Sequence, residues 1–232
     1  MALNVFRPKR IVSLSWFVVG AFVAPVVALL PQAAKPPDTQ PRISDQPLTS
    51  DQLAIYREIL HGWMDDQKHP VHLSIQTVPL EKDSDDCAKK VSLEKIDPLL
   101  IHRFRKEDVE QLGSKMIELV DPDVQRREVE KNDPGKAIRS GVTVDDAVNN
   151  GFAHGLVTLS EIRFDQKHEL AIVWYGFRCG GLCGNGGTAV MEKKNGVWQN
   201  KSYCSMWVSR GSGFQTLAGL AAIKINSYGN RR

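Results

Sequence analysis

The segment "ELAIVWYGFRCGGLCGNGGTAVMEKKNGVW", residues 169–198, decides the fold class. Runs rich in β-branched and aromatic residues flank a ten-residue glycine-rich stretch, "RCGGLCGNGG" at 178–187, and both flanks have the composition of β-strands. The dipeptide Asn195-Gly196 then predicts a two-residue hairpin turn, because both central residues of such a turn need positive φ angles. We therefore expect consecutive antiparallel strands, with 178–187 as a tight loop locked by its cysteines.

The neighbouring residues extend this sheet in both directions. Residues 156–164, "LVTLSEIRF", predict a strand that turns at 165–168, and residues 197–209 follow the Asn-Gly turn as the last strand. The outcome is a predicted four-stranded antiparallel meander. Counted from the turn, the register places Cys204 opposite Gly187, which would bring a third cysteine to the glycine-rich loop.

Upstream of the meander the sequence predicts a helix and a further strand. "TSDQLAIYREILHGWMDD", residues 49–66, begins with Thr49 and Gln52, the spacing of a capping box, and its apolar residues recur at helical intervals. "VHLSIQTVPL", residues 71–80, alternates as a half-buried strand, and Pro79 ends it or confines it to a sheet edge.

The middle of the chain is predicted to be mainly helical and partly irregular. Asp97-Pro98 has the order of a helix start, and 107–120 predicts a short helix broken near Gly113. Residues 121–141 are charged and predict a surface excursion, and 143–150 predicts a helix that ends at Gly151. The fold class is therefore α+β: a four- to five-stranded antiparallel sheet packed against N-terminal and middle helices, preceded by a signal or transmembrane helix.

The N-terminus has the pattern of an export signal. Arg7, Lys9 and Arg10 precede the uncharged stretch Ile11–Leu30, so residues 1–34 are either a cleaved signal peptide or an uncleaved anchor that holds the protein in the cytoplasmic membrane. The basic flank keeps the N-terminus in the cytoplasm and predicts a periplasmic or extracellular location for the remainder.

The rest of the chain divides into three parts. A proline-rich, disordered linker is expected at 35–48, a single exported domain at 49–209 and a flexible tail at 210–232. Of the 30 basic residues, three lie in 1–34, so the other 27 equal the 27 acidic residues. This neutrality gives no reason to expect a nucleic acid as a partner.

The four cysteines are expected to form disulfides. They are Cys87, Cys179, Cys183 and Cys204. A redox motif would have Cys-x-x-Cys at a helix start, and a zinc site would need four suitably spaced soft ligands, so structural bridges are favoured. Cys179 with Cys183 and Cys87 with Cys204 is the favoured pairing, and a bridge from Cys204 to one of the loop cysteines stays open. No cofactor is expected.

Five residues are candidates for binding. His154 lies between small residues in "GFAHG", where its ring would be reachable, although a structural role is favoured because no partner can be named. The meander also carries Trp174, Tyr175, Trp198 and Trp207. An exposed row of these rings could bind a peptide or a sugar, but apolar residues on both faces of 169–177 favour a place in the core.

Several stretches together resemble an uncharacterised family of exported proteins of soil bacteria. They are "AIYREILHGW" at 54–63, "VHLSIQTVPL" at 71–80 and 159–198, in which a Cys-Gly-x-Leu-Cys-Gly loop and the "EKKNGVW" turn are the most specific parts. The resemblance covers residues 51–209 and implies the order of elements. The family has no assigned activity, so it implies no catalytic residue.

These observations support one leading hypothesis and two alternatives. The leading hypothesis is a non-catalytic module of the cell envelope, exported or membrane-tethered, that binds a protein, peptide or glycan. One alternative is an envelope enzyme that uses His154 with a nearby acid. The other is a thiol–disulfide switch at Cys179 and Cys183.

Overall fold

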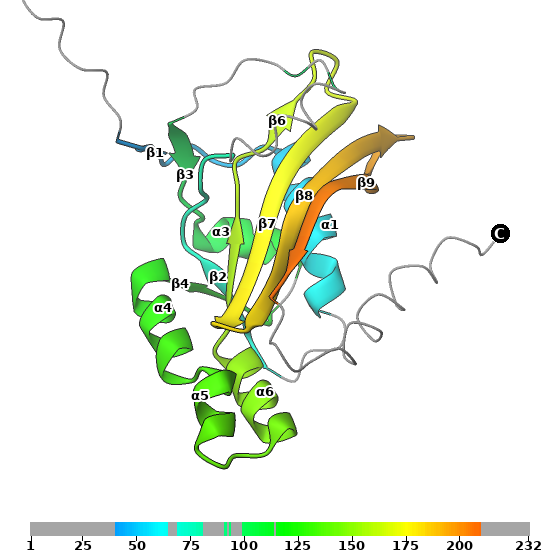
Figure 1. The fold of residues 1–232 in the computed structure, drawn as a ribbon. Coiled ribbons are helices and arrows are strands. Elements are labelled where there is room, and N and C mark those ends of the chain that lie inside the picture. Colours follow the sequence, from blue (N-terminus) through cyan, green and yellow to red (C-terminus); the bar gives the residue numbers. More distant parts are fainter. Residues whose placement is uncertain are drawn as a thin grey trace, which may run out of the picture. The chain divides into compact units, whose positions relative to one another are not determined.

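The computed structural model describes residues 40–64, 69–80, 91, 93, 99–113 and 115–209. These residues form one mixed α/β unit (Figure 1). Its elements in chain order are β1 (Arg42–Ser44), α1 (Ser50–Met64), β2 (Val71–Ser74), β3 (Leu100–His102), α3 (Lys106–Leu112), β4 (Ile117–Val120), α4 (Pro122–Lys131), α5 (Pro134–Arg139), α6 (Val144–Ala153), β5 (Leu156–Leu159), β6 (Arg163–Phe164), β7 (Leu170–Gly180), β8 (Cys183–Lys194) and β9 (Val197–Val208).

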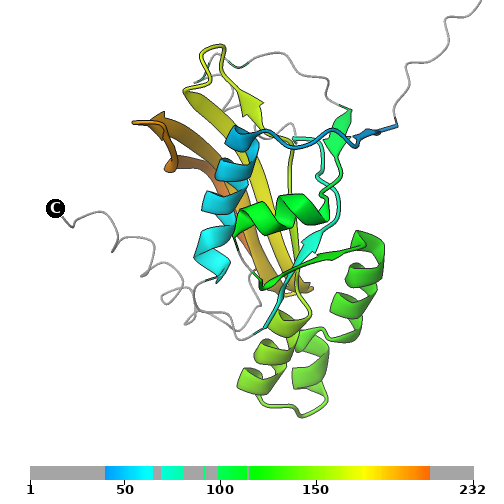
Figure 2. The ribbon, with the colours of Figure 1, turned by 180° about the vertical axis from the view of Figure 1, so that it is seen from behind.

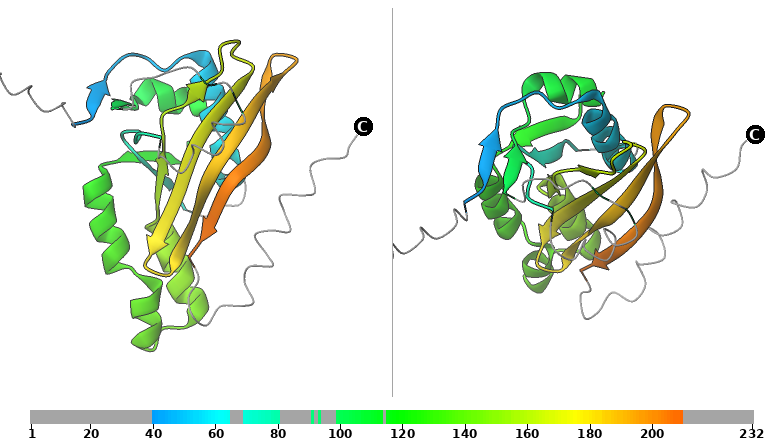
Figure 3. Two further views of the ribbon diagram at one scale, coloured as in Figure 1. Left: turned by 45° about the horizontal axis from the view of Figure 1, so that its top comes forward. Right: turned by 90° about the horizontal axis from the view of Figure 1, so that it is seen from above.

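Seven strands form the main sheet, in the order β4-β2-β5-β7-β8-β9 with β6 beside β7. The antiparallel half, β5 to β9, agrees with the predicted meander, and β7, β8 and β9 run side by side as a twisted ribbon (Figure 3). The other half is parallel, because β2 pairs in parallel with both β4 and β5. A purely antiparallel sheet of four to five strands was therefore the wrong expectation.

The position of β2 explains this difference. The strand ends at Ser74, before Pro79, and lies inside the sheet, so of the two alternatives for Pro79 the edge position is wrong. Three of its four residues are buried, as in strands covered on both faces. Its partner β4 lies at the end of the stretch 107–120, for which the sequence predicts a helix. That helix, α3, ends at Gly113, whose φ of 81° closes it.

Helices α1 and α3 lie against one face of the sheet, as Figure 2 shows from behind. The main core lies there and joins Tyr56 and other residues of α1 to alternate residues of the central strands, among them Leu73, Leu159, Val173 and Met191. A smaller cluster of Val91, Ile172 and Val190 covers part of the opposite face. Helix α1 has the expected capping box, in which the Thr49 N–H donates to Gln52 Oε1 over 2.9 Å and the Gln52 N–H donates to Thr49 Oγ1 over 3.2 Å.

Residues 121–141 form two helices, α4 and α5, where a surface excursion was expected. Each helix begins with an aspartate that caps it and a proline in its first turn, namely Asp121-Pro122 and Asp133-Pro134. The helix expected at 143–150 is present as α6, capped by Thr143, and continues two residues past Gly151.

One strand of a second, two-stranded sheet lies in the segment 35–48, which was expected to be disordered. Strand β1 falls within the predicted linker and pairs in parallel with β3, and Leu48 is buried in the main core. Several expectations lie outside the described residues: the signal or anchor at 1–34, the helix start at Asp97-Pro98, Cys87, and the tail from 210 onward. None of the helices that the structure describes is long and apolar enough to cross a membrane.

Candidate functional site

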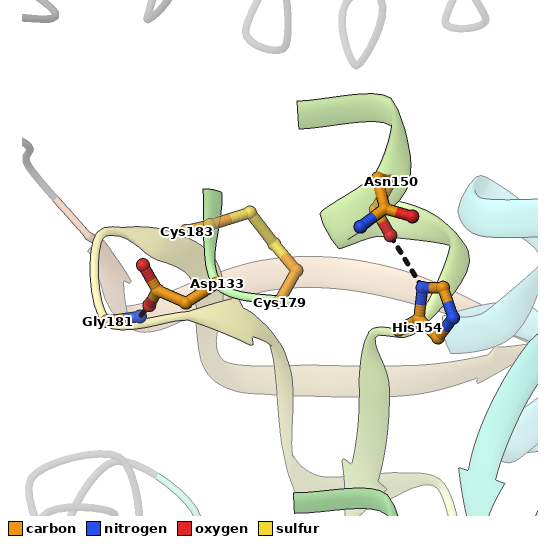
Figure 4. The surroundings of a disulfide bond; sticks show 6 residues. All are labelled: Asp133, Asn150, His154, Cys179, Gly181 and Cys183. Atoms are coloured by element: carbon orange, nitrogen blue, oxygen red, sulfur yellow. Dashed lines mark hydrogen bonds between the residues drawn. A yellow bond between two sulfur atoms is a disulfide. The ribbon is translucent and has the colours of Figure 1, made fainter. Parts of the chain in front are cut away.

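The glycine-rich stretch is part of two strands, contrary to the expected ten-residue loop. Strands β7 and β8 continue through it, and only Gly181 and Leu182 form the turn between them. A disulfide joins Cys179 to Cys183 across this turn, with a Cα–Cα distance of 5.0 Å (Figure 4). This confirms the favoured pairing within the hairpin and leaves neither loop cysteine for Cys204.

Cys204 is not opposite Gly187, as the sequence register implied. The residue that pairs with Gly187 is Met206, because two irregularities in the β8–β9 ladder shift the register. Cys204 lies between Tyr203 and Ser205 at one of these bulges, several residues from the hairpin tip. It is itself disulfide-bonded, and its predicted partner Cys87 lies outside the described residues, so that pairing stays a prediction.

Asp133 fixes the hairpin tip to the helices. Its side chain caps α5 by accepting from the Lys136 N–H over 2.9 Å. Its other oxygen accepts from the Gly181 N–H over 2.5 Å (Figure 4). Burial alone would raise the pKa of Asp133, but the N–H groups of Gly181, Lys136 and Gly135 outweigh it and lower this pKa below its usual value.

His154 ends α6 and has no acidic partner among the described residues. Its Nδ1 bonds to the backbone carbonyl of Asn150 over 2.8 Å (Figure 4). Its own carbonyl accepts from Gln125 Nε2 over 2.7 Å. The ring is half-buried. This arrangement is that of a histidine fixing a helix end, so the dyad of His154 and a nearby acid is not found in the described part of the chain.

The four candidate aromatic residues do not form one exposed row. Trp198 is 4% exposed and packs against Phe164, and Tyr175 is 9% exposed. The Trp174 ring lies over Gly176, and the Trp207 ring lies over Gly186, where a Cβ atom would come within 2.7 Å of the indole nitrogen. The four rings therefore do not form the single exposed row that a platform for a peptide or a sugar would need, and a binding role for any one of them stays a prediction.

Two features that the sequence did not reveal are more distinctive. The first is a buried cluster formed by Thr77, His102 and Glu161. His102 Nδ1 lies 2.8 Å from Glu161 Oε2, and the two side chains are 12% and 5% exposed. The residues come from separate parts of the chain, at spacings that match no sequence motif.

The second feature is the outer edge of β9. This twelve-residue strand ends the sheet, and no described strand pairs with its outer side. Its second half exposes Tyr203, Met206 and Val208, the last two by 57% and 61%. We call this strand side with these three side chains the β9 edge. An unpaired strand edge presents a row of free N–H and C=O groups.

Comparison with known proteins identifies no relative. No protein-family model, no curated protein and no solved structure matches the chain.

Proposed function

We propose that this protein is a non-catalytic, exported module that binds an extended segment of a partner protein along the β9 edge. The observation that carries the proposal is the position of β9 at the end of the sheet with its outer side unpaired among the described residues. An extended peptide can add to such an edge as a further strand, with main-chain hydrogen bonds giving affinity and side-chain contacts giving specificity.

The surface of β9 favours an apolar partner segment. Lys201 is the only charged residue of the strand, and the large apolar side chains that its second half exposes are those of Tyr203, Met206 and Val208. A methionine adapts its shape to different partners, which suits a peptide-binding surface. A highly charged ligand would find little to pair with along this strand.

The bulges restrict where the partner can pair. They lie between Thr188 and Ala189 and between Val190 and Met191 in the β8 numbering, so β9 is regular only on either side of them. Because a bulge interrupts the row of backbone groups, the regular run Ser205–Val208 is the best template for a short added strand. The exposed Met206 and Val208 lie in this run.

Export is the second part of the proposal. It is supported by the Cys179–Cys183 disulfide, since such bonds persist mainly in oxidising compartments, and by the predicted signal at 1–34. Expression of the full chain in a Gram-negative host, followed by fractionation and intact mass spectrometry, tests this part. Recovery from the periplasm or from the cytoplasmic membrane supports export, whereas a soluble cytoplasmic protein of full mass contradicts it.

Peptide binding can be tested with a phage-displayed library of random linear peptides. We expect apolar sequences to be enriched and to protect the β9 amides from hydrogen exchange. Met206→Asp and Val208→Asp should each weaken the enriched peptides about tenfold, equivalent to about 1.4 kcal/mol. The matched control is Val124→Asp, which changes an apolar residue of α4 that is 51% exposed.

Three results would contradict the proposal. Peptides that bind without protecting β9, or that bind the Met206→Asp and Val124→Asp variants equally well, would place the binding surface elsewhere. A library from which no peptide is enriched would contradict a peptide-binding function.

A further inference from the structure

Three separate segments of the chain meet at Glu161. The backbone N–H of Glu161 donates to the Val78 carbonyl over 2.8 Å, and the Thr77 N–H donates to the His102 carbonyl over 2.9 Å. These bonds hold together the residues that follow β2, the end of β3 and the bend between β5 and β6. Glu161 lies at the centre of this junction and is 4% exposed.

The Glu161 carboxylate accepts hydrogen bonds from both of the other segments. Its Oε1 accepts from the Thr77 hydroxyl and, over 2.7 Å, from the His102 backbone N–H. Its Oε2 is 2.8 Å from His102 Nδ1. An ionised carboxylate only accepts hydrogen bonds, so Nδ1 carries a hydrogen and His102 gains or loses its proton at Nε2. Within the described residues, Nε2 makes no hydrogen bond.

The junction fastens the small β1–β3 sheet to the main sheet. Ser44 of β1 pairs with His102 of β3, and the Arg103 N–H donates to the Ser44 carbonyl over 3.1 Å. Strand β1 is the first strand of the described residues. Through β3, the interaction of His102 with Glu161 therefore also determines how firmly β1 is held.

We propose that Thr77, His102 and Glu161 form a proton-dependent clasp, which holds the β1–β3 sheet most firmly when His102 is protonated. Deprotonation leaves the Nδ1–H bond to Glu161 in place but removes the attraction between opposite charges. The clasp thus loosens without breaking. This inference concerns a different part of the domain from the β9 edge and does not depend on it.

The charges around His102 favour its protonated form. Besides Glu161, the charged groups near it are Asp108, which is 1% exposed and paired with Arg105 over 3.0 Å, and Arg103, which lies 4.0 Å from Asp45. The hydrogen bond to Glu161 raises the pKa of His102, burial opposes it, and the charges of Glu161 and Asp108 raise it further. Tyr56 stays neutral here, because burial and the charge of Glu161 raise its pKa.

The raised pKa fixes the direction of the pH dependence. A group whose pKa is higher in the folded form stabilises that form fully below its ordinary pKa, which is about 6.5 for histidine. The stabilisation is lost as the pH rises through the folded value. The β1–β3 sheet should therefore open more readily as the pH increases above about 6.5.

Two measurements on the full chain test the clasp together. NMR titration gives the pKa of His102, and hydrogen exchange gives the protection of the Arg42 and Arg103 amides, which bond to Leu99 and Ser44. After correction for intrinsic exchange, the protection of these two amides should fall about tenfold for each unit by which the His102 pKa is raised. Amides of the β7–β8 ribbon are the internal reference and should not change.

Two matched variants separate the clasp from other causes. His102→Asn keeps an N–H near the position of Nδ1 but cannot titrate, so the pH dependence of the Arg42 and Arg103 protection should vanish. His154→Asn removes another half-buried histidine and should leave that dependence unchanged. If His102→Asn does not fold, the unmodified chain still tests the inference, because the pH at which protection falls must match the His102 pKa measured by NMR.

Three results would overturn the inference. A His102 pKa at or below its ordinary value would remove the driving force. If the His102 pKa is raised but the protection of the Arg42 and Arg103 amides does not change with pH, the protonation of His102 does not affect the β1–β3 sheet. An equal loss of protection in the β7–β8 ribbon would mean that the whole domain opens.

Discussion

The carboxylate of Asp133, at the start of α5, accepts a hydrogen bond from the backbone N–H of Gly181, at the tip of the β7–β8 hairpin. The same side chain caps α5. One residue thus joins a helix to a hairpin that lies 48 positions further along the chain. We expect Asp133→Ala to lower the free energy of unfolding by about 2 kcal/mol, through loss of the cap and of this acceptor.

Urea denaturation measures this loss, and Asp145→Ala is a suitable control because Asp145 is an exposed acid in the first turn of α6. Equal stability of the two variants would show that Asp133 does not hold the hairpin.

The Cys179–Cys183 bond should behave as a structural bridge. Cys179 is fully buried, which shields its sulfur from attacking thiols. Replacing both cysteines by alanine should cost about 2 kcal/mol in the chain-entropy account of a five-residue ring. Thiol trapping and mass spectrometry after mild reductant should find the bond intact in the folded protein. Rapid reduction of the folded protein would instead favour the thiol–disulfide switch.

A side chain at Gly187 should destabilise the fold. A Cβ atom at this position would lie far inside contact distance of the Ser205 carbonyl oxygen, so the β8–β9 ladder would have to shift. We expect Gly187→Ala to cost about 1–3 kcal/mol, as overpacked sites do. Gly181→Ala is the matched control, since its nearest neighbour is a side-chain oxygen at 3.3 Å. A thermal shift no larger than that of the control would disprove the close approach.

The buried carboxylate at the clasp should be costly to remove. Glu161→Ala leaves the Thr77 hydroxyl and the His102 ring without their shared acceptor, and we expect a loss of about 3–5 kcal/mol. Glu118→Ala removes a side chain that is 60% exposed and should cost less than about 1 kcal/mol. Chemical denaturation of both variants at neutral pH makes the comparison, and similar losses would contradict a special role of Glu161.

The pairing of Asp51 with Lys193 should give a small acid-sensitive contribution. The two side chains meet over 2.8 Å and tie α1 to β8. Burial raises the pKa of Asp51, but the hydrogen bond and charge of Lys193 lower it below its usual value. The stabilisation is therefore present above the ordinary aspartate pKa of about 3.9 and is lost as the pH falls through the folded value.

Lys193→Met should reduce this acid sensitivity at a cost of less than about 1 kcal/mol at neutral pH, while the lowering of the Asp51 pKa by Trp198 remains. Stability curves measured between pH 7 and pH 3 make the comparison. An unchanged slope in the variant would assign the acid sensitivity to other carboxylates.

Local signals in the sequence predicted local structure well. The Thr49–Gln52 capping box and the Asn195-Gly196 turn both appear where expected, because each depends only on neighbouring residues. The Asp-Pro starts of α4 and α5 have the same order as Asp97-Pro98, but the charge of residues 121–141 and their scarcity of large apolar residues predict a surface excursion instead. These helices bury little, as Gln125 and Val129 are the buried residues of α4.

Relations between distant residues could not be predicted in the same way. Alternation shows that β2 is a strand, but it does not show that β4 and β5 are its parallel partners. The register of β9 depends on two irregularities in its pairing with β8, at Thr188–Ala189 and at Val190–Met191, which a count from the Asn195-Gly196 turn does not include. His102 and Glu161 are 59 residues apart and belong to no motif, so only the fold brings them together.

The position of β2 between β4 and β5 also has a consequence for the order of folding. The β7–β8 and β8–β9 hairpins join neighbouring segments and can form as soon as their own residues are available. Strand β2 must wait for β5, more than eighty residues later in the chain, before its parallel pairing with that strand can form. We therefore expect the C-terminal ribbon to form first and the N-terminal strands to join it afterwards, although they are synthesised earlier.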